Sequence, residues 1–317
     1  MSSSTFDKRA KAGPAPPKRA RSKPSAVGPS PAYGIPAIAF FALFALLPMV
    51  IVVWLSLQAW SGIDTPTFTG LTNWTRLFSD PVTLHALWLS VEVMVLSWVV
   101  QTPISILLGV YLAGEQRHRS VLAILYMLPL LLSSAAVALT WRALLDPNFG
   151  GVTELFSAVG LGAFGSQLLS HEQLVLFVIV MIIGWQFIPL HTLLYRAAVR
   201  QIPSQMFEAA LIDGASKTQQ FFSITLPQLK NTVVTSTTLM LVGSLTYFDV
   251  VFILTKGGPG NATRLLPLDM YLNGFQKYDL GYASAIALVL AVAGIVLSLL
   301  LSRLSGFGRF ESDSEGA

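Results

Sequence analysis

The residues that could perform chemistry are few and scattered along this chain. The sequence contains no cysteine, which excludes disulfides and thiolate metal sites. No nucleophile stands at a diagnostic spacing from a base, so we expect a protein that is not an enzyme. The histidines also lack the spacing of metal ligands, and we predict no metal site from any of the four: His85, His118, His171 and His191.

Glycine-rich sequences could bind phosphates, and one such pattern is present. Residues 160–165 read Gly-Leu-Gly-Ala-Phe-Gly and match G-x-G-x-x-G. That pattern binds a dinucleotide only between a strand and a helix, whereas here it lies in a connection between two apolar segments. The P-loop sequence for ATP, G-x-x-x-x-G-K-[ST], occurs nowhere in the chain. We therefore expect this chain to bind no cofactor, with any ATP and Mg held by another protein.

The composition predicts an integral membrane protein. Hydrophobic residues make up 53% of the chain and charged residues only 11%, against about 25% charged in soluble domains. Crossing a bilayer takes about 20 apolar residues, and lipid leaves only helices or closed barrels as spanning structures. Segments of this length are too long for barrel strands, so we predict an all-α fold with six transmembrane helices at 35–59, 93–114, 120–141, 173–195, 231–255 and 280–302.

Charge placement predicts the orientation. With the N-terminus inside, fifteen Lys and Arg residues fall on the cytoplasmic side and five outside, and basic residues favour the cytoplasm. Both termini are therefore predicted to be cytoplasmic, and the basic charge needs no nucleic-acid partner.

The same pattern divides the chain into parts. These are a disordered basic tail at 1–32, a first transmembrane helix at 33–59, a permease core at 84–303 with a cytoplasmic connection at 196–230, and a second tail at 304–317.

Within the predicted bundle only Glu92 and Asp249 are ionisable, apart from histidines. Glu92 and Asp249 are each expected to pair with a neighbouring residue. A transporter driven by a proton or sodium gradient usually has more carboxylates there, or broken helices around an ion site. A separate energy source is therefore favoured, and a self-contained secondary transporter or channel stays the alternative.

The cytoplasmic connection contains two predicted short helices. Ser204 is expected to cap a helix at 205–213, and Gly214 to end it in a left-handed conformation. Residues 216–219, Ser-Lys-Thr-Gln, predict a capping box at the start of the second helix, which Pro227 is expected to end.

Two helices joined at a glycine bend suit a docking surface. Ala209 and Ala210 give a small apolar face, and Glu208 and Asp213 could make charge-assisted contacts with a partner protein. On physical grounds an amphipathic helix at the membrane surface fits equally well.

Sequence resemblance decides between these two interpretations. Residues 208–215, Glu-Ala-Ala-Leu-Ile-Asp-Gly-Ala, followed by Ile-Thr-Leu-Pro at 224–227, resemble the EAA loop of binding-protein-dependent ABC transporter permeases of type I. In that family the loop forms a coupling helix that sits in a cleft of the ATPase. The resemblance assigns this role to Glu208, Ala209, Ala210, Asp213, Gly214, Leu226 and Pro227.

A second resemblance narrows the class to sugar uptake. Residues 254–263, Leu-Thr-Lys-Gly-Gly-Pro-Gly-Asn-Ala-Thr, are similar to a stretch of carbohydrate permeases of the maltose and glycerol-3-phosphate type, and 54–57 and 70–74 also fit that group. The resemblance implies ATP-driven import of a sugar across a bacterial cell membrane. The implied partners are a second homologous permease, a dimer of ABC ATPase subunits, an extracytoplasmic solute-binding protein and the lipid bilayer.

A sugar needs hydrogen-bonding groups and an aromatic face within an otherwise apolar bundle. Ser244 and Tyr247 are three residues apart and are expected to share a helix face, and the resemblance places sugar contacts near them. Polar residues of this kind also bond neighbouring helices, and that alternative stays open. The predicted substrate-pathway residues are Gln186, Phe187, His191, Ser244, Tyr247 and Asp249. The identity of the sugar does not follow from the sequence.

Overall fold

A computed structural model describes residues 31–305, so both predicted tails lie almost wholly outside the described residues. The chain forms two compact units, Met1–Pro48 and Met49–Ala317. The described part of the first unit is helical, and the sequence boundary between the units falls within α2. Its elements are η1 (Pro31–Gly34), α1 (Ile35–Phe41), η2 (Ala42–Leu46) and the beginning of α2 (Leu47–Leu55).

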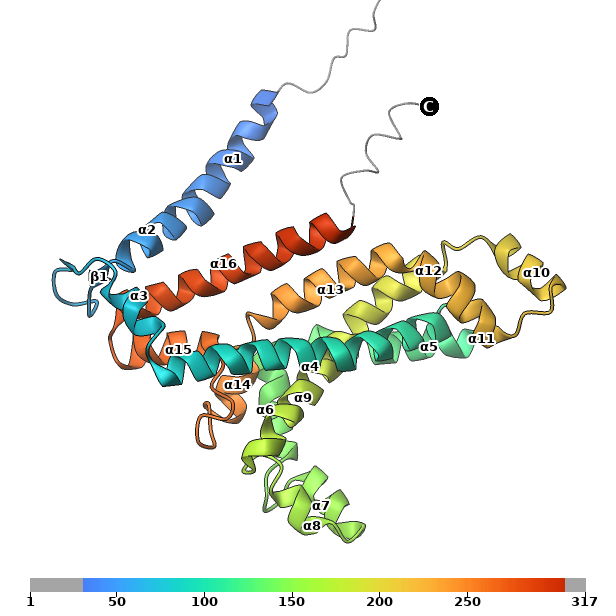
Figure 1. Cartoon of the computed structure of the whole chain (residues 1–317). Coiled ribbons are helices and arrows are strands. Elements are labelled where there is room, and N and C mark those ends of the chain that lie inside the picture. Colours follow the sequence, from blue (N-terminus) through green and yellow to red (C-terminus); the bar gives the residue numbers. More distant parts are fainter. Residues whose placement is uncertain (1–30, 306–317) are drawn as a thin grey trace, which may run out of the picture. The chain divides into compact units, whose positions relative to one another are not determined.

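Long helices form the framework of the second unit (Figure 1). They are α4 (Pro81–Leu112), α9 (Glu172–Val199), α13 (Lys230–Ser244) and α16 (Leu280–Ser305). α4 packs along α9, while α13 contacts both α4 and α16. The contact between α4 and α9 is close at Gly109, where an added Cβ would lie 2.6 Å from the Cβ of Tyr195. Only glycine therefore fits at this helix contact.

Four helices in the described range are long and apolar enough to cross a membrane: Ile35–Leu55, Pro81–Leu112, Glu172–Val199 and Leu280–Arg303. A fifth candidate is a pair of helices bent by 97°. A helical multi-pass membrane fold is therefore confirmed, whereas six continuous spans are not.

The second predicted span begins twelve residues earlier than expected, at Pro81 rather than residue 93. Asp80 is its N-cap, and its carboxylate accepts a hydrogen bond from the Val82 N–H at 2.9 Å. Proline is favoured at the first helical position because its missing N–H would have no partner there. The Asp-Pro signal was present in the sequence, but apolar length alone did not reveal it.

The third predicted span, 120–141, is bent. α5 (Arg117–Tyr126) and a 3-10 turn, η3 (Leu128–Leu131), are separated from α6 (Ser134–Leu144) by an extended Leu132 and Ser133. The Ser133 hydroxyl accepts a hydrogen bond from the Ala136 N–H at 3.2 Å and so caps α6 as a new helix. The uncharged sequence hid this break.

The prediction of one continuous helix at 231–255 is wrong. α13 ends at Ser244, and α14 (Asp249–Leu254) begins after four non-helical residues. Hydroxyls compete with the helical bonding pattern here: Ser244 donates to the Leu241 carbonyl at 2.6 Å and Thr246 to the Gly243 carbonyl at 2.7 Å. α14 packs against α6, so the two broken helices meet.

Between α6 and α9 lie two short helices, α7 (Gly151–Ala158) and α8 (Gly162–Ser166). The G-x-G-x-x-G residues follow α7 and run into α8. Among the described residues the only strands are β1 (Gln58–Ala59) and β2 (Thr67–Phe68), an antiparallel pair far away in sequence. The pattern thus follows a helix and does not have the strand before it that a dinucleotide-binding loop requires.

The β1–β2 hairpin is held against the start of α16. Asn73, in α3 (Thr72–Leu77), donates to the backbone carbonyls of Ser56 and Gln58 at 3.0 and 2.8 Å. A Cβ added to Gly281 would collide with the Gln58 carbonyl oxygen. The hairpin therefore packs closely on α16 at Gly281.

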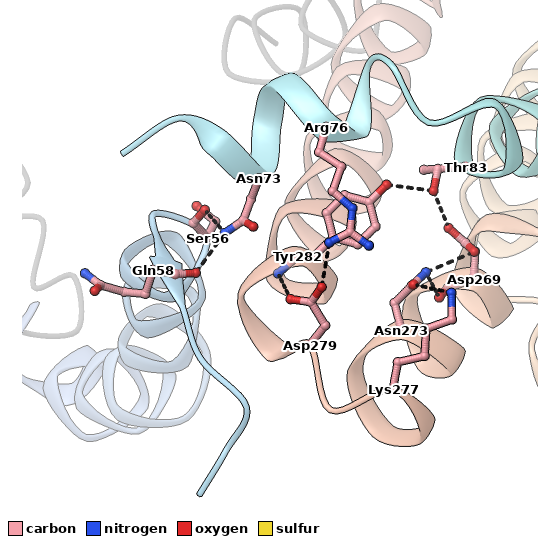
Figure 2. Close-up of polar contacts among 10 residues, drawn as sticks. All are labelled: Ser56, Gln58, Asn73, Arg76, Thr83, Asp269, Asn273, Lys277, Asp279 and Tyr282. Carbon is pink, nitrogen blue, oxygen red and sulfur yellow. Dashed lines mark hydrogen bonds and ion pairs between the residues drawn. The ribbon is translucent and has the colours of Figure 1, made fainter. Parts of the chain in front are cut away.

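A buried polar network joins α4 to α15 and α16 (Figure 2). Asp269 is fully buried in α15 (Leu266–Tyr271), which continues into η5 (Leu272–Gln276). Its carboxylate pairs with Arg264 at 2.6 Å and accepts a hydrogen bond from Thr83 at 2.8 Å. The Thr83 hydroxyl also bonds the Tyr282 hydroxyl at 2.8 Å, and Arg76 lies over the Tyr282 ring.

Candidate functional site

The predicted docking segment begins with α10 (Ser204–Ile212), at the end of the unit away from β1 and α3 (Figure 1). The Gly214 N–H donates to the Leu211 carbonyl at 3.1 Å, and the Ala215 N–H donates to the Ala210 carbonyl at 2.8 Å. This is the double hydrogen bond of a Schellman motif. Gly214 has φ +77°, which confirms the predicted left-handed helix end.

The start of α10 differs from the prediction. Ser204 is its first helical residue, Pro203 is the N-cap, and no side chain of the described chain caps this end. Ser204 therefore does not cap the helix, because Pro203 has extended backbone geometry that already sets the helix entry one residue earlier.

The second half of the segment starts with the predicted capping box. Ser216 accepts a hydrogen bond from the Gln219 N–H at 3.3 Å, and the Gln219 side chain accepts one from the Ser216 N–H at 2.7 Å. Helical structure then continues through α11 (Lys217–Gln220), η4 (Phe221–Thr225) and α12 (Leu226–Gln228). Pro227 does not end the helix as predicted: it lies directly after the π-helical η4, and the helical stretch continues through it to Gln228.

α10 exposes the residues to which the resemblance assigns coupling. Glu208, Ala209 and Asp213 are exposed, and α10 has no buried residue. The Glu208 and Asp213 carboxylates form no hydrogen bond or ion pair with any residue in the range 31–305. Beside them Leu211 and Ile212 expose 67% and 87% of their surface. α10 thus presents unpaired charge next to apolar surface.

The far end of the segment is anchored in the bundle. Leu226 packs against a small core formed by Ile106, Tyr195 and Leu229, whereas Pro227 is exposed. Of the predicted coupling residues, Leu226 therefore positions the segment, and those of α10 remain accessible.

A second candidate site is a cavity of about 370 Å³ beside the break between α13 and α14. Ser134 at the start of α6 and Phe187 and His191 of α9 lie on its wall, together with Tyr247 and Asp249 from the break and the start of α14. Phe187 and Tyr247 are stacked with ring centroids 6.1 Å apart. The volume falls in the usual range for small-molecule pockets, about 300 to 1,000 Å³.

Two predicted pathway residues do not line this cavity. Gln186 is buried in α9 and donates to the Leu132 carbonyl at 3.1 Å, which satisfies a backbone group exposed by the bend before α6. Ser244 is buried and bonds its own helix. Tyr247 lies in the non-helical break after α13, so the two residues do not share a helix face as predicted. Gln186 and Ser244 serve the helix breaks instead.

Among the lining residues, sequence reasoning missed Ser134. The only signal was the Ser-Ser pair at 133–134 shortly after Pro129, which could have indicated a new helix start. The His191 side chain forms a hydrogen bond through its Nδ1, which lies 2.9 Å from the Ser236 hydroxyl of α13. The predicted pairing of Asp249 is absent among the described residues, and its carboxylate is exposed.

A larger groove of about 850 Å³ lies between α13, α15 and α16. Its lining is almost wholly apolar, with residues such as Val242, Met270 and Leu290, and only Thr246 and Ser298 add hydroxyls. A hydroxyl-rich molecule would lose its hydrogen bonds there. The smaller cavity is therefore the better candidate for polar cargo.

The turn after α14 has the tight geometry that its glycines suggest. Gly257 and Gly260 have φ +92° and +55°. The Thr263 hydroxyl donates to the Gly258 carbonyl at 2.8 Å and lies 2.7 Å from the Thr255 hydroxyl, which closes the turn. This turn stabilises the end of α14, and its residues line neither the 370 Å³ cavity nor the 850 Å³ groove.

Apolar helices long enough to span a membrane, with helix breaks beside a partly polar cavity, indicate a membrane transport protein. Residues 32–306 match the family described as "Binding-protein-dependent transport system inner membrane component", and the chain belongs to this family.

Similar proteins match most of the chain. The "Probable ABC transporter permease protein YurN" of Bacillus subtilis is 34% identical over 87% of this chain and 96% of its own length. The trehalose/maltose transport system permease protein MalF of Thermococcus litoralis is 30% identical over 88% of this chain and 93% of its own. A chain of a bacterial alginate ABC transporter, solved with an alginate-bound periplasmic protein, has the same fold, with a TM-score of 0.75 at 22% identity over 87% of this chain and 93% of that one.

Proposed function

We propose that this chain is the permease subunit of an ATP-driven importer and forms half of the translocation pathway for a sugar. The observation that carries this is the pairing of an exposed, glycine-bent α10 with a cavity that combines aromatic and polar groups. Family membership and relatives named for trehalose/maltose, diacetylchitobiose and arabinooligosaccharide transport support the sugar class.

The proposed assembly contains a second, similar permease, two copies of an ATPase and an extracytoplasmic solute-binding protein. ATP and Mg would bind the ATPase. The fifteen-to-five distribution of basic residues supports cytoplasmic termini in a bacterial cell membrane, and it also supports a cytoplasmic position for α10, where an ATPase could reach it.

Mechanically, α10 would sit in a groove of the ATPase. Its apolar Leu211 and Ile212 would be desolvated there, and Glu208 would make a charge-assisted hydrogen bond. Closure of the ATPase dimer on ATP would move α10. α12 and α13 follow in nearly continuous helix as far as the break beside the cavity, so this movement would change access to the cavity.

Reconstitution tests the proposal. The chain with its partner permease should import sugar only when the ATPase and ATP are added, and Glu208→Arg should abolish uptake and ATPase co-purification. Glu154→Gln is the matched control, because Glu154 is an exposed carboxylate on α7, away from both sites. Gly214→Pro should uncouple the complex while leaving membrane insertion intact.

A self-contained secondary transporter would behave differently. Uptake by this chain alone, driven by a proton or sodium gradient, would refute the proposal. So would normal coupling in both the Glu208 and Gly214 variants.

A further inference from the structure

The proposed pathway cavity contains one formally charged side chain, Asp249. The other lining residues are apolar, aromatic or neutral and polar, apart from His191, whose Nδ1 is engaged with the Ser236 hydroxyl. Asp249 is exposed at the start of α14 and forms no hydrogen bond or ion pair within the described range. No basic side chain within the described range forms an ion pair with Asp249.

Four other aspartates of the described chain have structural duties that Asp249 lacks, although Asp213 in the exposed turn after α10 is also unpaired. Asp80 caps α4, Asp146 accepts hydrogen bonds from the backbone after it, and Asp269 and Asp279 each pair with an arginine. Asp249 contributes no such bond, so its carboxylate is available to a molecule in the cavity.

The rest of the wall suits a saccharide. The stacked Phe187 and Tyr247 give an aromatic surface for the C–H face of a sugar ring, and Ser134 and the Tyr247 hydroxyl supply hydrogen-bonding groups. An aromatic face also attracts cations and not anions, because its quadrupole is negative. The aromatic surface and the carboxylate therefore favour the same sign of charge.

We infer that Asp249 gives this half of the pathway a negative potential that selects neutral or cationic saccharides, such as amino sugars, over anionic ones such as uronates. This inference rests on the proposed function. It adds a charge class of cargo and a single residue that sets it.

The size of the effect follows from Coulomb's law. For a unit charge about 10 Å from the carboxylate in a partly hydrated cavity, with an effective dielectric constant of about 40, the local concentration of a cation rises about fourfold and that of an anion falls about fourfold. The ratio of cation to anion concentration should thus change by about tenfold or more when the carboxylate is neutralised. The change should shrink at high salt.

The absence of cysteine in this chain makes the potential measurable. In the intact transporter complex, Thr246→Cys or Ser134→Cys places one thiol on the cavity wall. Rates of modification of this chain by a cationic trimethylammonium and an anionic sulfonate methanethiosulfonate reagent are then measured by mass spectrometry. Adding Asp249→Asn should lower the ratio of the cationic to the anionic rate about tenfold.

Matched variants separate charge from shape. Asp249→Glu should keep the ratio, and Glu154→Gln, which removes an equal charge outside the cavity, should leave it unchanged. An unchanged ratio in Asp249→Asn would overturn the inference. Failure of both introduced thiols to react would also overturn it, because the cavity would then not be open to water.

Cargo uptake provides the second measurement. With its own binding protein, the reconstituted complex should import neutral or amino saccharides and not uronate oligosaccharides. ATP-driven uptake of a uronate at the rate of a neutral saccharide would refute the proposed charge selection. It would not contradict the proposed importer function. No ATP-driven uptake of any saccharide would instead count against the proposed function.

Discussion

The buried carboxylate of Asp269 should be the most sensitive charged position in the fold. Asp269 is fully buried, and Arg264, its partner, is 13% exposed. Asp269→Ala removes the acceptor for Arg264, Thr83 and one hydrogen bond of Asn273. The arginine then remains in a largely dry site with its charge unbalanced.

The expected loss follows from burial. Removing one partner of a buried ion pair costs about 3 to 5 kcal/mol. The control is Arg76→Ala, in an ion pair with Asp279 whose side chains are 44% and 30% exposed. A pair of that exposure contributes about 0.2 to 1 kcal/mol, and the contact of Arg76 with the Tyr282 ring adds about 0.5 to 1 kcal/mol.

Thermal unfolding of the purified complex in mild detergent, followed by tryptophan fluorescence, compares the two variants. At the soluble-protein conversion of about 2 to 4 °C per kcal/mol, Asp269→Ala should lower the midpoint by more than about 6 °C and Arg76→Ala by clearly less. Asp269→Asn should fall between the two, because it keeps an acceptor but loses the charge. Equal shifts for the two alanine variants, or the reverse order, would refute the reasoning from burial.

Other substitutions test single contacts. Gly214→Ala should weaken ATPase co-purification more than Gly214→Asn, because φ +77° costs an alanine about 1 kcal/mol and asparagine less. Gly109→Val should prevent a monodisperse peak in size-exclusion chromatography, since a Cβ there meets Tyr195 at 2.6 Å, whereas Gly243→Ala, with nothing within 4 Å, should not. Gln186→Leu should lower the thermal midpoint by the equivalent of about 0.6 to 1.7 kcal/mol by freeing the Leu132 carbonyl; an unchanged midpoint would argue against its structural role.

Sequence reasoning predicted some of the features that local chemistry determines, although the predicted cap at Ser204 and the helix end at Pro227 were wrong. The Schellman turn at Gly214 and the capping box at Ser216 depend on residues within five positions, so both were predicted correctly. The apolar runs also predicted the helical membrane class, because bilayer thickness fixes the length of a span.

The helix breaks could not be predicted in this way. An uncharged run looks the same whether it is straight or bent, and the bend at Ser133 is stabilised by Gln186, which lies 53 residues further along the chain. The end of α13 depends on hydroxyls that could equally have bonded within a continuous helix. The cavity wall follows from these breaks, so Ser134 was missed, and Gln186 and Ser244 were placed on a wall that they support from behind.

The turn between α10 and α11 closes its own hydrogen bonds, through the Schellman pair on one side and the capping box on the other. No side chain on the exposed face of α10 takes part in those bonds. The backbone conformation of the segment therefore does not depend on its exposed side chains. We expect that Glu208, Leu211 or Ile212 can be substituted without a change in this conformation. In evolutionary terms, we expect the segment to be transferable between permeases. Its exposed side chains could change to fit a different ATPase while the helices behind it stay unchanged.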